Sequence, residues 1–348
     1  MLKASIVGAS GYSGGELVRL LSGHPNVELE ILTASSQQGR RMEESFPSLK
    51  GFSEHTLVAP DWQQLGEASD VVFLALPHGL SMAGAPGLLE AGAKVVDLGA
   101  DFRLHDVALY REWYDLEHSA PDLLEDAVYG LPELNREVIR GARLVACPGC
   151  YPTAASLALM PLLRSLSEAG TDVVGTIIVD AKSGVSGAGR TATMGTHFSE
   201  VNENVKAYKL GVHRHMPEMQ QTFGVLGSDA PVFFSPHLVP MTRGILATCY
   251  ASLDAVPSQV EAQRLWQETY EGHPFVRVLS EGLPETKATL GSNFCDLAVR
   301  VDPEKQLVVA VAALDNLVKG AAGQAIQCMN LMFDLAEEEG LWQAPVFP

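Results

Sequence analysis

The chain has 348 residues, which is enough for about two domains that each bury a core. Its formal net charge of −18 at pH 7 opposes binding to nucleic acid and to anionic membrane surfaces, so we expect neither as a partner. No apolar run reaches the roughly 18 residues of a membrane helix. The five cysteines have irregular spacing and no signal peptide is evident, which favours a cytoplasmic protein without disulfides.

A glycine-rich turn follows the first apolar stretch. Residues 3–8 are typical of a short strand, and residues 16–21 are typical of a helix. Gly8, Gly11 and Gly14 lie between them, at a spacing that lets the backbone approach a pyrophosphate at a helix N-terminus. The alternative is a tight turn that binds nothing. We expect cofactor contacts at Gly8, Ser10, Gly11, Tyr12, Ser13 and Gly14.

The end of the second expected strand, residues 27–33, indicates which dinucleotide binds. NAD sites usually carry Asp or Glu about 20 residues after the glycines, where it holds the ribose 2′-hydroxyl. Residues 33–41 contain hydroxyl groups and two arginines but no acid, which suits the 2′-phosphate of NADPH and NADP⁺. Ser35 and Arg40 are the expected contacts. Alternatively, Arg40 and Arg41 are solvated loop charges.

Further apolar stretches at 70–76, 94–98 and 144–146 alternate with helical sequence. Such runs are typical of parallel strands covered on both faces, so we expect a Rossmann-type, doubly wound parallel sheet in an α/β fold. Ligands bind beyond the carboxyl ends of these strands, where Pro77 and Arg103 lie. Pro77 is expected near the cofactor. Arg103 is expected to meet an anion on the substrate, or else to pair with Asp101 or Asp106.

Cys150 follows the last of these strands after a Pro-Gly turn. The next residues favour a helix, with Pro152 in its first turn, so Cys150 should lie at a helix N-terminus. The positive end of a helix favours thiolate over thiol, as a nucleophile requires. The alternative is a buried, inert cysteine, which is the commonest state of a free cysteine.

A β-rich run over residues 173–182 ends in a loop of small residues, 183–190. Successive backbone N–H groups in such a loop can bind phosphate or contact a nicotinamide ring, so Ser183 and Gly184 are expected at the cofactor. Arg190 closes the loop and is expected at the substrate. The alternative is a flexible loop, as is usual for Gly/Ser-rich sequence.

One residue separates the two histidines His213 and His215, and Pro217 and Glu218 follow them. In an extended segment both imidazoles point to one side, and Glu218 behind them would orient one as a general acid/base. The sequence does not indicate whether His213 or His215 takes the proton. A zinc site and satisfied structural histidines are the alternatives, although no third ligand is evident, so we expect no metal.

The remaining strands cluster without helices between most of them, at 231–240, 244–252, 293–301 and 306–313. This arrangement favours a mixed or antiparallel sheet in an α+β domain, with one helix near 258–270. A final helix over 321–338 is expected to return to the first domain. The expected domains are therefore 1–149 with 317–348, and 150–316 for catalysis and oligomerisation. Cys249, Cys295 and Cys328 lie on apolar stretches and are expected in the core.

Five motifs in this order carry a resemblance to a known family: 8–14 (GASGYSG), 148–154 (PGCYPTA), 183–190 (SGVSGAGR), 213–218 (HRHMPE) and 315–322 (DNLVKGAA). From end to end the chain resembles the N-acetyl-γ-glutamyl-phosphate reductases of arginine biosynthesis. The resemblance implies NADPH, a catalytic cysteine at Cys150 and an acid/base histidine within the 213/215 pair. It also implies a homodimer or homotetramer formed through the second sheet.

A more distant likeness to aspartate-semialdehyde dehydrogenases implies that Arg103 contacts the substrate phosphate and that Asn316 lies near the nicotinamide. Tyr151, next to Cys150, is expected among the substrate contacts. The implied reaction converts N-acetyl-L-glutamyl 5-phosphate to N-acetyl-L-glutamate 5-semialdehyde and phosphate, through a thioester on Cys150 that NADPH reduces.

Three rival functions remain open at this stage. In the first rival function, the enzyme reduces another acyl phosphate, such as aspartyl phosphate, or a carrier-protein-bound form of the acetylated substrate. Cys147 departs from the family pattern and forms Cys-Pro-Gly-Cys with Cys150, so the second rival is a thiol-disulfide redox protein or an NADP-linked sensor that uses both cysteines. A zinc hydrolase would use His213 and His215 as ligands.

Overall fold

The computed structural model describes residues 1–347 and separates into two compact units with different sheets. One unit comprises residues 1–149 and 321–342, and the other comprises 150–320 and 343–347. The expected domain division after residues 149 and 316 stays a prediction. The compact units differ from it because residues 317–320 and 343–347 make their contacts within the second unit.

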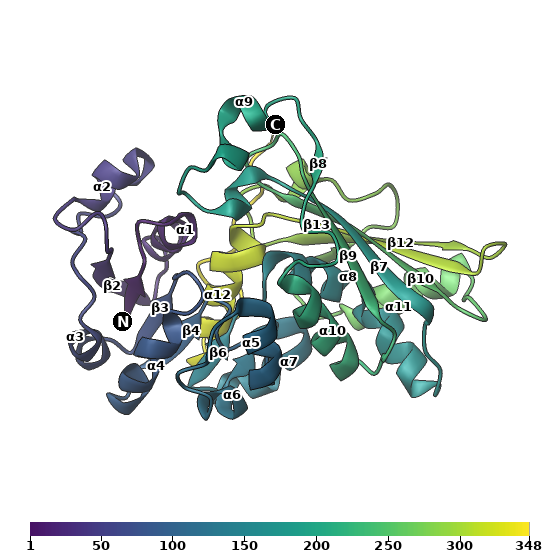
Figure 1. Cartoon of the computed structure of the whole chain (residues 1–348), viewed down its shortest axis with the longest axis horizontal. Helices are drawn as coiled ribbons and strands as arrows, with labels where there is room; N and C mark the ends of the chain where they lie inside the picture. The colour runs from purple at the N-terminus through teal and green to yellow at the C-terminus, as the bar shows by residue number, and fades with distance from the viewer. Residues whose placement is uncertain (348) are drawn as a thin grey trace. The chain divides into compact units, whose positions relative to one another are not determined.

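The first unit is built on a six-stranded parallel sheet with the strand order β2-β1-β3-β4-β6-β5 (Figure 1). Its strands are β1 (Leu2–Val7), β2 (Val27–Thr33), β3 (Val71–Leu74), β4 (Lys94–Asp97), β5 (Val128–Tyr129) and β6 (Leu144–Ala146). All neighbouring pairs run parallel, and the residues of β3 are buried throughout. The predicted doubly wound sheet is confirmed.

Helices of the first unit connect these strands and cover the sheet. They are α1 (Tyr12–Leu21), α2 (Met42–Ser45), α3 (Trp62–Ala68), α4 (Ser81–Glu90), α5 (Val107–Tyr114), α6 (Leu123–Asp126), α7 (Pro132–Gly141) and α12 (Gly323–Met332), with the 3-10 turn η1 (Pro47–Leu49). The C-terminal helix α12 packs against α1, α7 and β4. The C-terminal helix and the N-terminal strands, although far apart in the sequence, therefore belong to the same unit.

Two features of the first unit differ from the prediction. The stretch between β4 and residue 135, for which no element was predicted from the sequence, contains α5 and α6, which are anchored by a few buried side chains such as Tyr110 and Leu124. The last helix was expected to reach residue 338 but ends at Met332, and Asp334 then adopts a left-handed φ of 55° that a helix cannot contain. A π-helical turn, η5 (Val318–Ala322), precedes it.

The second unit contains a seven-stranded mixed sheet with the order β11-β12-β13-β10-β7-β9-β8. Its strands are β7 (Val174–Ser183), β8 (Lys206–Ala207), β9 (Val232–Leu238), β10 (Ile245–Ser252), β11 (Val276–Val278), β12 (Cys295–Asp302) and β13 (Leu307–Leu314). The predicted mixed sheet is confirmed. The edge strands β8 and β11, two and three residues long, were not predicted because such short segments show no periodicity.

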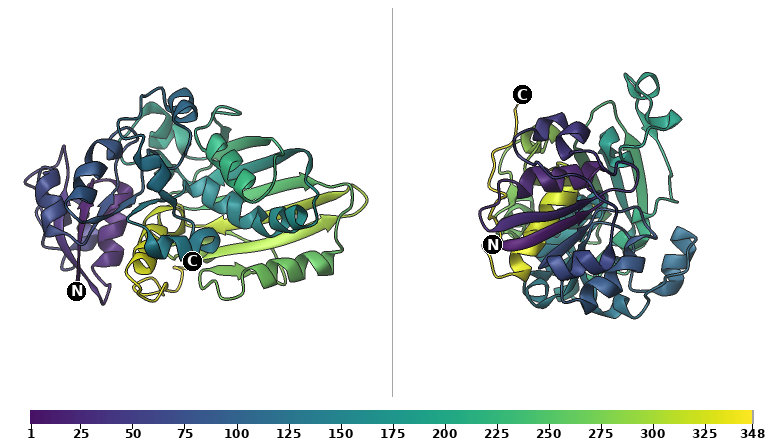
Figure 2. Two further views of the ribbon diagram at one scale, coloured as in Figure 1. Left: turned by 90° about the horizontal axis from the view of Figure 1, so that it is seen from below. Right: turned by 90° about the vertical axis from the view of Figure 1, so that its left-hand side faces the viewer.

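Helices cover one face of this second sheet and leave the other open (Figure 2). The helices that contact the sheet are α8 (Cys150–Glu168), α10 (His215–Val225) and α11 (Gln259–Thr269). The unit also contains the short helix α9 (Phe198–Val201) and the 3-10 turns η2 (Val185–Ala188), η3 (Met194–Thr196) and η4 (Thr286–Thr289). Ile177 and Val179 of β7 are fully buried beneath the helices, whereas Ile178 between them is 43% exposed. We call the side of β7, β9 and β10 that carries Ile178 the open face.

All five cysteines are free thiols, and three of them lie in the core as predicted. Cys249, Cys295 and Cys328 are fully buried. Burial, followed by the charge of Asp180, raises the pKa of Cys249 to about 12, so this thiol stays protonated and inert.

Candidate active site

The glycine-rich turn after β1 is held by close backbone packing. Gly8 has φ +92°, and a Cβ there would lie 2.4 Å from the carbonyl oxygen of Ala75. A Cβ at Gly14 would lie 2.3 Å from the carbonyl oxygen of Gly8, so α1 begins directly against the strand. Gly11 is the N-cap of α1, which has no side-chain cap and no acidic residue in its first turn. This helix start is therefore suited to an anionic ligand.

The end of β2 offers polar groups to the ribose of such a ligand. The Thr33 hydroxyl is buried and has no hydrogen-bond partner within residues 1–347. Ser35 and Arg40 are exposed in the following loop, whereas Arg41 pairs with Glu43 at 3.3 Å. No acid lies between residues 34 and 41. The donor set fits a dinucleotide with a 2′-phosphate, and Arg40 is its available cation.

Two buried carboxyl groups organise the ends of β3 and β4. Asp101 accepts hydrogen bonds from the backbone N–H groups of Gly79 and Ser81, at 2.6 and 2.9 Å, and from the Tyr110 hydroxyl at 2.8 Å. It therefore caps the start of α4. Burial, followed by Asp101, raises the pKa of Asp97 to about 7, so a proton resides on Asp97 at mildly acidic pH.

Arg103 is 7% exposed and lies at the carboxyl ends of two strands. Its Nε donates to the carbonyl oxygen of Cys147 at 2.7 Å, and its Nη2 donates to the carbonyl oxygen of Leu98 at 2.9 Å. Asp106, the other expected carboxylate partner, instead caps α5. The guanidinium thus fixes the chain just before the Pro-Gly turn that leads to Cys150, and it keeps a positive charge at this edge of the sheet.

Cys150 is the first residue of α8, as predicted. The helix has 19 residues, with no acidic residue in its first turn and Pro152 in that turn. Cys150 is partly exposed, unlike the other four cysteines. Gly320 lies against it, since a Cβ at Gly320 would stand 2.7 Å from the Cys150 Cβ. The thiol therefore lies at a positive helix end, and Cys150 packs on one side against the backbone of Gly320, which has no side chain.

Two tyrosines lie close to this thiol. The hydroxyl groups of Tyr151 and Tyr208 are 3.0 Å apart and hydrogen bonded. Burial chiefly raises the pKa of Tyr208 to about 12, and the nearby Cys150 adds to the rise. Burial, Tyr208 and Cys150 raise the pKa of Tyr151 as well. Both phenols are thus neutral hydrogen-bonding groups rather than bases.

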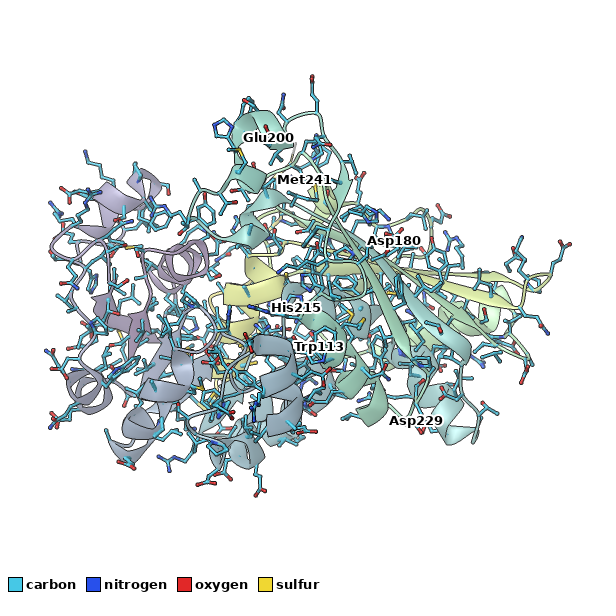
Figure 3. All side chains as sticks on the ribbon, in the orientation of Figure 1. Trp113, Asp180, Glu200, His215, Asp229 and Met241 are labelled. Atoms are coloured by element: carbon cyan, nitrogen blue, oxygen red, sulfur yellow. The ribbon has the colours of Figure 1, made fainter. Side chains whose placement is uncertain are left out.

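The two histidines lie beside these tyrosines, and His215 begins α10 (Figure 3). The imidazole centroids of His213 and His215 are 4.8 Å apart, and the Tyr151 ring lies 5.8 and 5.9 Å from them. Burial, followed by Lys209 and Arg214, lowers the pKa of His213 to about 4. Glu218 is buried in the first turn of the same helix. Cys150, both tyrosines and both histidines therefore gather in the second unit.

The loop after β7 is held by Asn316. The Asn316 Oδ1 accepts from the Gly244 N–H at 2.7 Å, and its Nδ2 donates to the Ser186 Oγ at 3.0 Å. Ser183 and Gly184 are buried at the start of this loop, whereas Arg190 is exposed beyond it. Asn316 thus joins the loop to the start of β10, a role that the sequence did not indicate.

Two residues of this site had no predicted role. Tyr208 lies in a segment without a recognisable motif, and its hydrogen bond to Tyr151 and its ring contact with His213 place it at the site. Gly320 belongs to the 315–322 motif, but its contact with Cys150 joins positions 170 apart in the sequence numbering and needs the fold. No local signal could have identified either contact.

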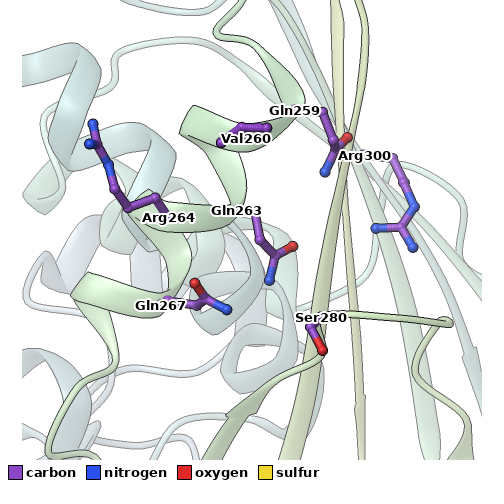
Figure 4. Close-up of a pocket in the computed structure, with 7 residues that line it drawn as sticks. All are labelled: Gln259, Val260, Gln263, Arg264, Gln267, Ser280 and Arg300. Carbon is purple, nitrogen blue, oxygen red and sulfur yellow. The ribbon is translucent and has the colours of Figure 1, made fainter.

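A separate hollow in the second unit lies between α11 and β12 (Figure 4). Its glutamines mainly complete the sheet: Gln259 bonds to the carbonyl of Val299 and the N–H of Val301, and Gln263 bonds to the carbonyl of Leu279. These side chains satisfy an exposed sheet edge. Across residues 1–347, no three His, Cys, Asp or Glu side chains are grouped as metal ligands. Nor does the described chain contain a helix with the length and apolar character to cross a bilayer.

Two family models match the chain. The model described as "Semialdehyde dehydrogenase, NAD binding domain" matches residues 3–142, and "Semialdehyde dehydrogenase, dimerisation domain" matches residues 150–316. Among curated relatives, the N-acetyl-gamma-glutamyl-phosphate reductase of Symbiobacterium thermophilum is 54% identical, covering 100% of this chain and 99% of its own. That of Pelotomaculum thermopropionicum is 51% identical, with the same coverage of both chains.

Solved structures share the fold at lower identity. Aspartate semialdehyde dehydrogenase II of Vibrio cholerae, complexed with ASA, has a TM-score of 0.69 at 20% identity and covers 96% of this chain and 98% of its own. The aspartate semialdehyde dehydrogenase of Candida albicans with NADP has a TM-score of 0.70 at 18% identity, with the same coverage.

The contact between Gly320 and Cys150 yields a stability prediction. Replacing Gly320 with Ala forces Cys150 or its helix to move, so we expect the free energy of unfolding to fall by about 1–3 kcal/mol, as for other overpacked sites. Gly224→Ala is the matched control, because a Cβ at this position in α10 meets nothing within 4 Å. It should raise stability by about 0.5–1 kcal/mol. Urea denaturation of both variants measures the difference, and equal stability of Gly320→Ala and wild type would contradict the tight contact.

Proposed function

Since this chain belongs to the semialdehyde dehydrogenase family, we propose that it reduces N-acetyl-L-glutamyl 5-phosphate to N-acetyl-L-glutamate 5-semialdehyde with NADPH, in arginine biosynthesis. The names of relatives about 50% identical over the full chain support this substrate. The observation that carries the proposal is the partly exposed Cys150 at the start of α8, near two tyrosines whose rings contact the pair of histidines.

Cys150 is the proposed nucleophile. Its thiolate attacks the carbonyl carbon of the acyl phosphate, a C–S bond forms, and the bond from that carbon to the phosphate oxygen breaks as phosphate leaves with the electron pair. The start of α8 favours the thiolate because its positive end faces the sulfur. The covalent thioester then holds the acyl carbon in place for reduction, which removes an entropic cost from the second step.

We assign the acid/base role to His215. Reduction of the thioester places negative charge on the acyl oxygen, and His215 protonates it. The same imidazole takes the proton back as the carbonyl reforms and the Cys150 thiolate departs. His213 is the weaker candidate because its lowered pKa of about 4 leaves it neutral and a poor base at neutral pH. Glu218 is the proposed partner that orients the acid/base pair.

NADPH, when bound, supplies the hydride for this reduction. Gly8, Ser10, Gly11, Tyr12, Ser13 and Gly14 are its proposed pyrophosphate contacts, with Ser35, Arg40, Pro77, Ser183, Gly184 and Asn316 as the remaining ones. The tight turn before α1 and the acid-free end of β2 support this assignment. The proposed substrate contacts are Arg103, Tyr151 and Arg190, whose charges and hydroxyl suit a phosphate and an amide.

Assembly through the second unit is the remaining part of the proposal. The matched dimerisation domain supports oligomerisation, and we propose a homodimer, with a homotetramer as the alternative, formed through the open face. Ile178 and Phe233 are neighbours across β7 and β9 and are 43% and 45% exposed. Asp180, on the same face (Figure 3), forms an ion pair with Lys182, and its Oδ1 lies 3.2 Å from Nδ1 of His237. Exposed apolar anchors with a paired charge cluster are typical of a protein interface.

We also propose a cytoplasmic location, because all five cysteines are free thiols and reducing compartments keep thiols in that state.

The reaction run backwards tests the chemistry. With N-acetylglutamate 5-semialdehyde and NADP⁺, we expect NADPH to appear only when inorganic phosphate is added, because the thioester needs an acceptor that forms the acyl phosphate. Absorbance at the nicotinamide band measures this. Aspartate semialdehyde serves as the rival substrate and should give a much lower kcat/KM. Phosphate-independent NADPH formation would contradict the acyl-phosphate assignment.

Two cysteine variants serve as controls in the same assay. Cys150→Ser should be inactive, whereas Cys147→Ser should keep activity, because Cys147 is buried and a thioester mechanism needs one thiol. Loss of activity in both variants would favour the dithiol alternative.

Cofactor preference tests the role of Arg40. Replacing it with Ala should raise KM for NADPH by about 10-fold or more, the equivalent of one lost charge-assisted hydrogen bond. KM for NADH should change little, because NADH has no 2′-phosphate. Arg41→Ala is the matched control, since Arg41 pairs with Glu43. An Arg40→Ala enzyme with an unchanged ratio of the two KM values would place the 2′-phosphate elsewhere.

Light scattering after gel filtration tests the assembly. Phe233→Glu should reduce the oligomer toward the monomer, because a like charge from each copy would be buried at the interface. Val260→Glu, on α11 away from the open face and 78% exposed, should leave the mass unchanged. Circular dichroism confirms that both variants fold. An unchanged mass for Phe233→Glu would exclude the open face as the interface.

A further inference from the structure

The backbone N–H groups at the start of α10 donate their hydrogen bonds to a single residue, His213. Helices begin with backbone N–H groups that have no partner in the helix. Here the His215 N–H donates to Nδ1 of the His213 imidazole at 3.1 Å, and the Met216 N–H donates to the His213 carbonyl oxygen at 2.9 Å. The next residue, Pro217, has no N–H. His213 therefore satisfies both of the N–H groups that open this helix.

This arrangement restricts the protonation of His213. Nδ1 accepts a hydrogen bond only when it carries no proton, so the ring is neutral with its proton on Nε2. Protonation of Nδ1 would place one N–H donor opposite another, the His215 N–H, and the hydrogen bond between them would be lost. The lowered pKa of His213, caused by burial and then by Lys209 and Arg214, agrees with this geometry.

The surroundings of the ring restrict its rotation. Aromatic rings pack against the His213 imidazole nearly edge-on, from three other segments: Tyr151 of α8 at 5.8 Å, Tyr208 after β8 at 5.6 Å and Phe234 of β9 at 5.1 Å between centroids. The charged or titratable groups around it are those two phenols, Lys209, Arg214 and the His215 imidazole. A ring enclosed in this way cannot easily turn its Nε2 toward a substrate, but it can hold one hydrogen bond in a defined direction.

We propose that His213 is a positioning residue: as a neutral acceptor it sets the first turn of α10 and thereby aims the His215 imidazole at the reacting acyl group. This inference rests on the proposed acid/base role of His215. It divides the work of the two histidines, with the proton on His215 and the alignment on His213.

Two substitutions at position 213 separate alignment from proton transfer. The Oδ1 of Asn lies two bonds from Cβ, as Nδ1 does, whereas the Oε1 of Gln lies three bonds away, as Nε2 does. His213→Asn therefore keeps an acceptor for the His215 N–H, and His213→Gln keeps only a polar group at the other ring position. We expect kcat of His213→Asn within about five-fold of wild type and kcat of His213→Gln lowered on the order of 10- to 100-fold.

The pH dependence of kcat gives the readout that separates the two roles. His213→Asn should keep the wild-type ionisation limb, because His215 still carries the proton. If His213 were the acid/base, both variants would lose kcat by about 10²- to 10⁴-fold and that limb would disappear, which would overturn the proposal. Equal kcat for His213→Asn and His213→Gln would also overturn it.

Thermal unfolding tests the neutral state of the folded His213 ring independently of activity. Between pH 4 and 6.5 the unfolded chain binds more protons at position 213 than the folded one, because the folded pKa is about 4, so this histidine makes stability rise with pH over that range. The slope should be smaller in His213→Asn. His215→Asn reports separately on the proposed function: if it retained full kcat, the acid/base assignment would fail, while the cap would still be measured by the melting profile of the 213 variants.

Discussion

The structure depends on how the N–H groups at the starts of its helices are satisfied. At α4 and α10 the protein supplies its own acceptors, the Asp101 carboxylate and the His213 imidazole. At α1 there is no side-chain cap, and neither α1 nor α8 has an acidic residue in its first turn. The capped helix starts hold loops in place, whereas the starts of α1 and α8 suit an anion. One requirement of backbone chemistry thus separates positioning elements from binding elements.

Several unrelated contacts hold the chain around Cys150. The chain that leads to it is held by the bond from Arg103 to the Cys147 carbonyl. Its own backbone packs on Gly320, and its neighbour Tyr151 is bonded to Tyr208. Each contact restricts a different part of this segment, which comprises the Pro-Gly turn and the first helical turn of α8. Such restriction suits the nucleophilic role that we propose for Cys150, because a nucleophile must be held precisely to react with a carbonyl.

The two sheets serve different purposes because their faces are covered differently. In the first unit, helices bury both faces of a parallel sheet, so chemistry is confined to the loops at the carboxyl ends of the strands. In the second unit, helices bury one face only, and the open face presents Ile178 and Phe233 beside the charged Asp180. A sheet with one covered face can carry a binding site on the covered side and leave the open side for a protein interface.

The sequence alone determined the parts of this protein that local chemistry dictates. Apolar runs that alternate with helices predicted the first sheet, and apolar runs that cluster without helices predicted the second. The glycine spacing predicted the turn before α1, and Pro152 predicted a helix near Cys150, because each signal lies within a few neighbouring residues. Only the tertiary structure decided that Asp101 caps α4, that Gly320 lies against Cys150 and that Nδ1 of His213 is occupied. Those outcomes depend on burial and on contacts between distant segments, which no local pattern encodes.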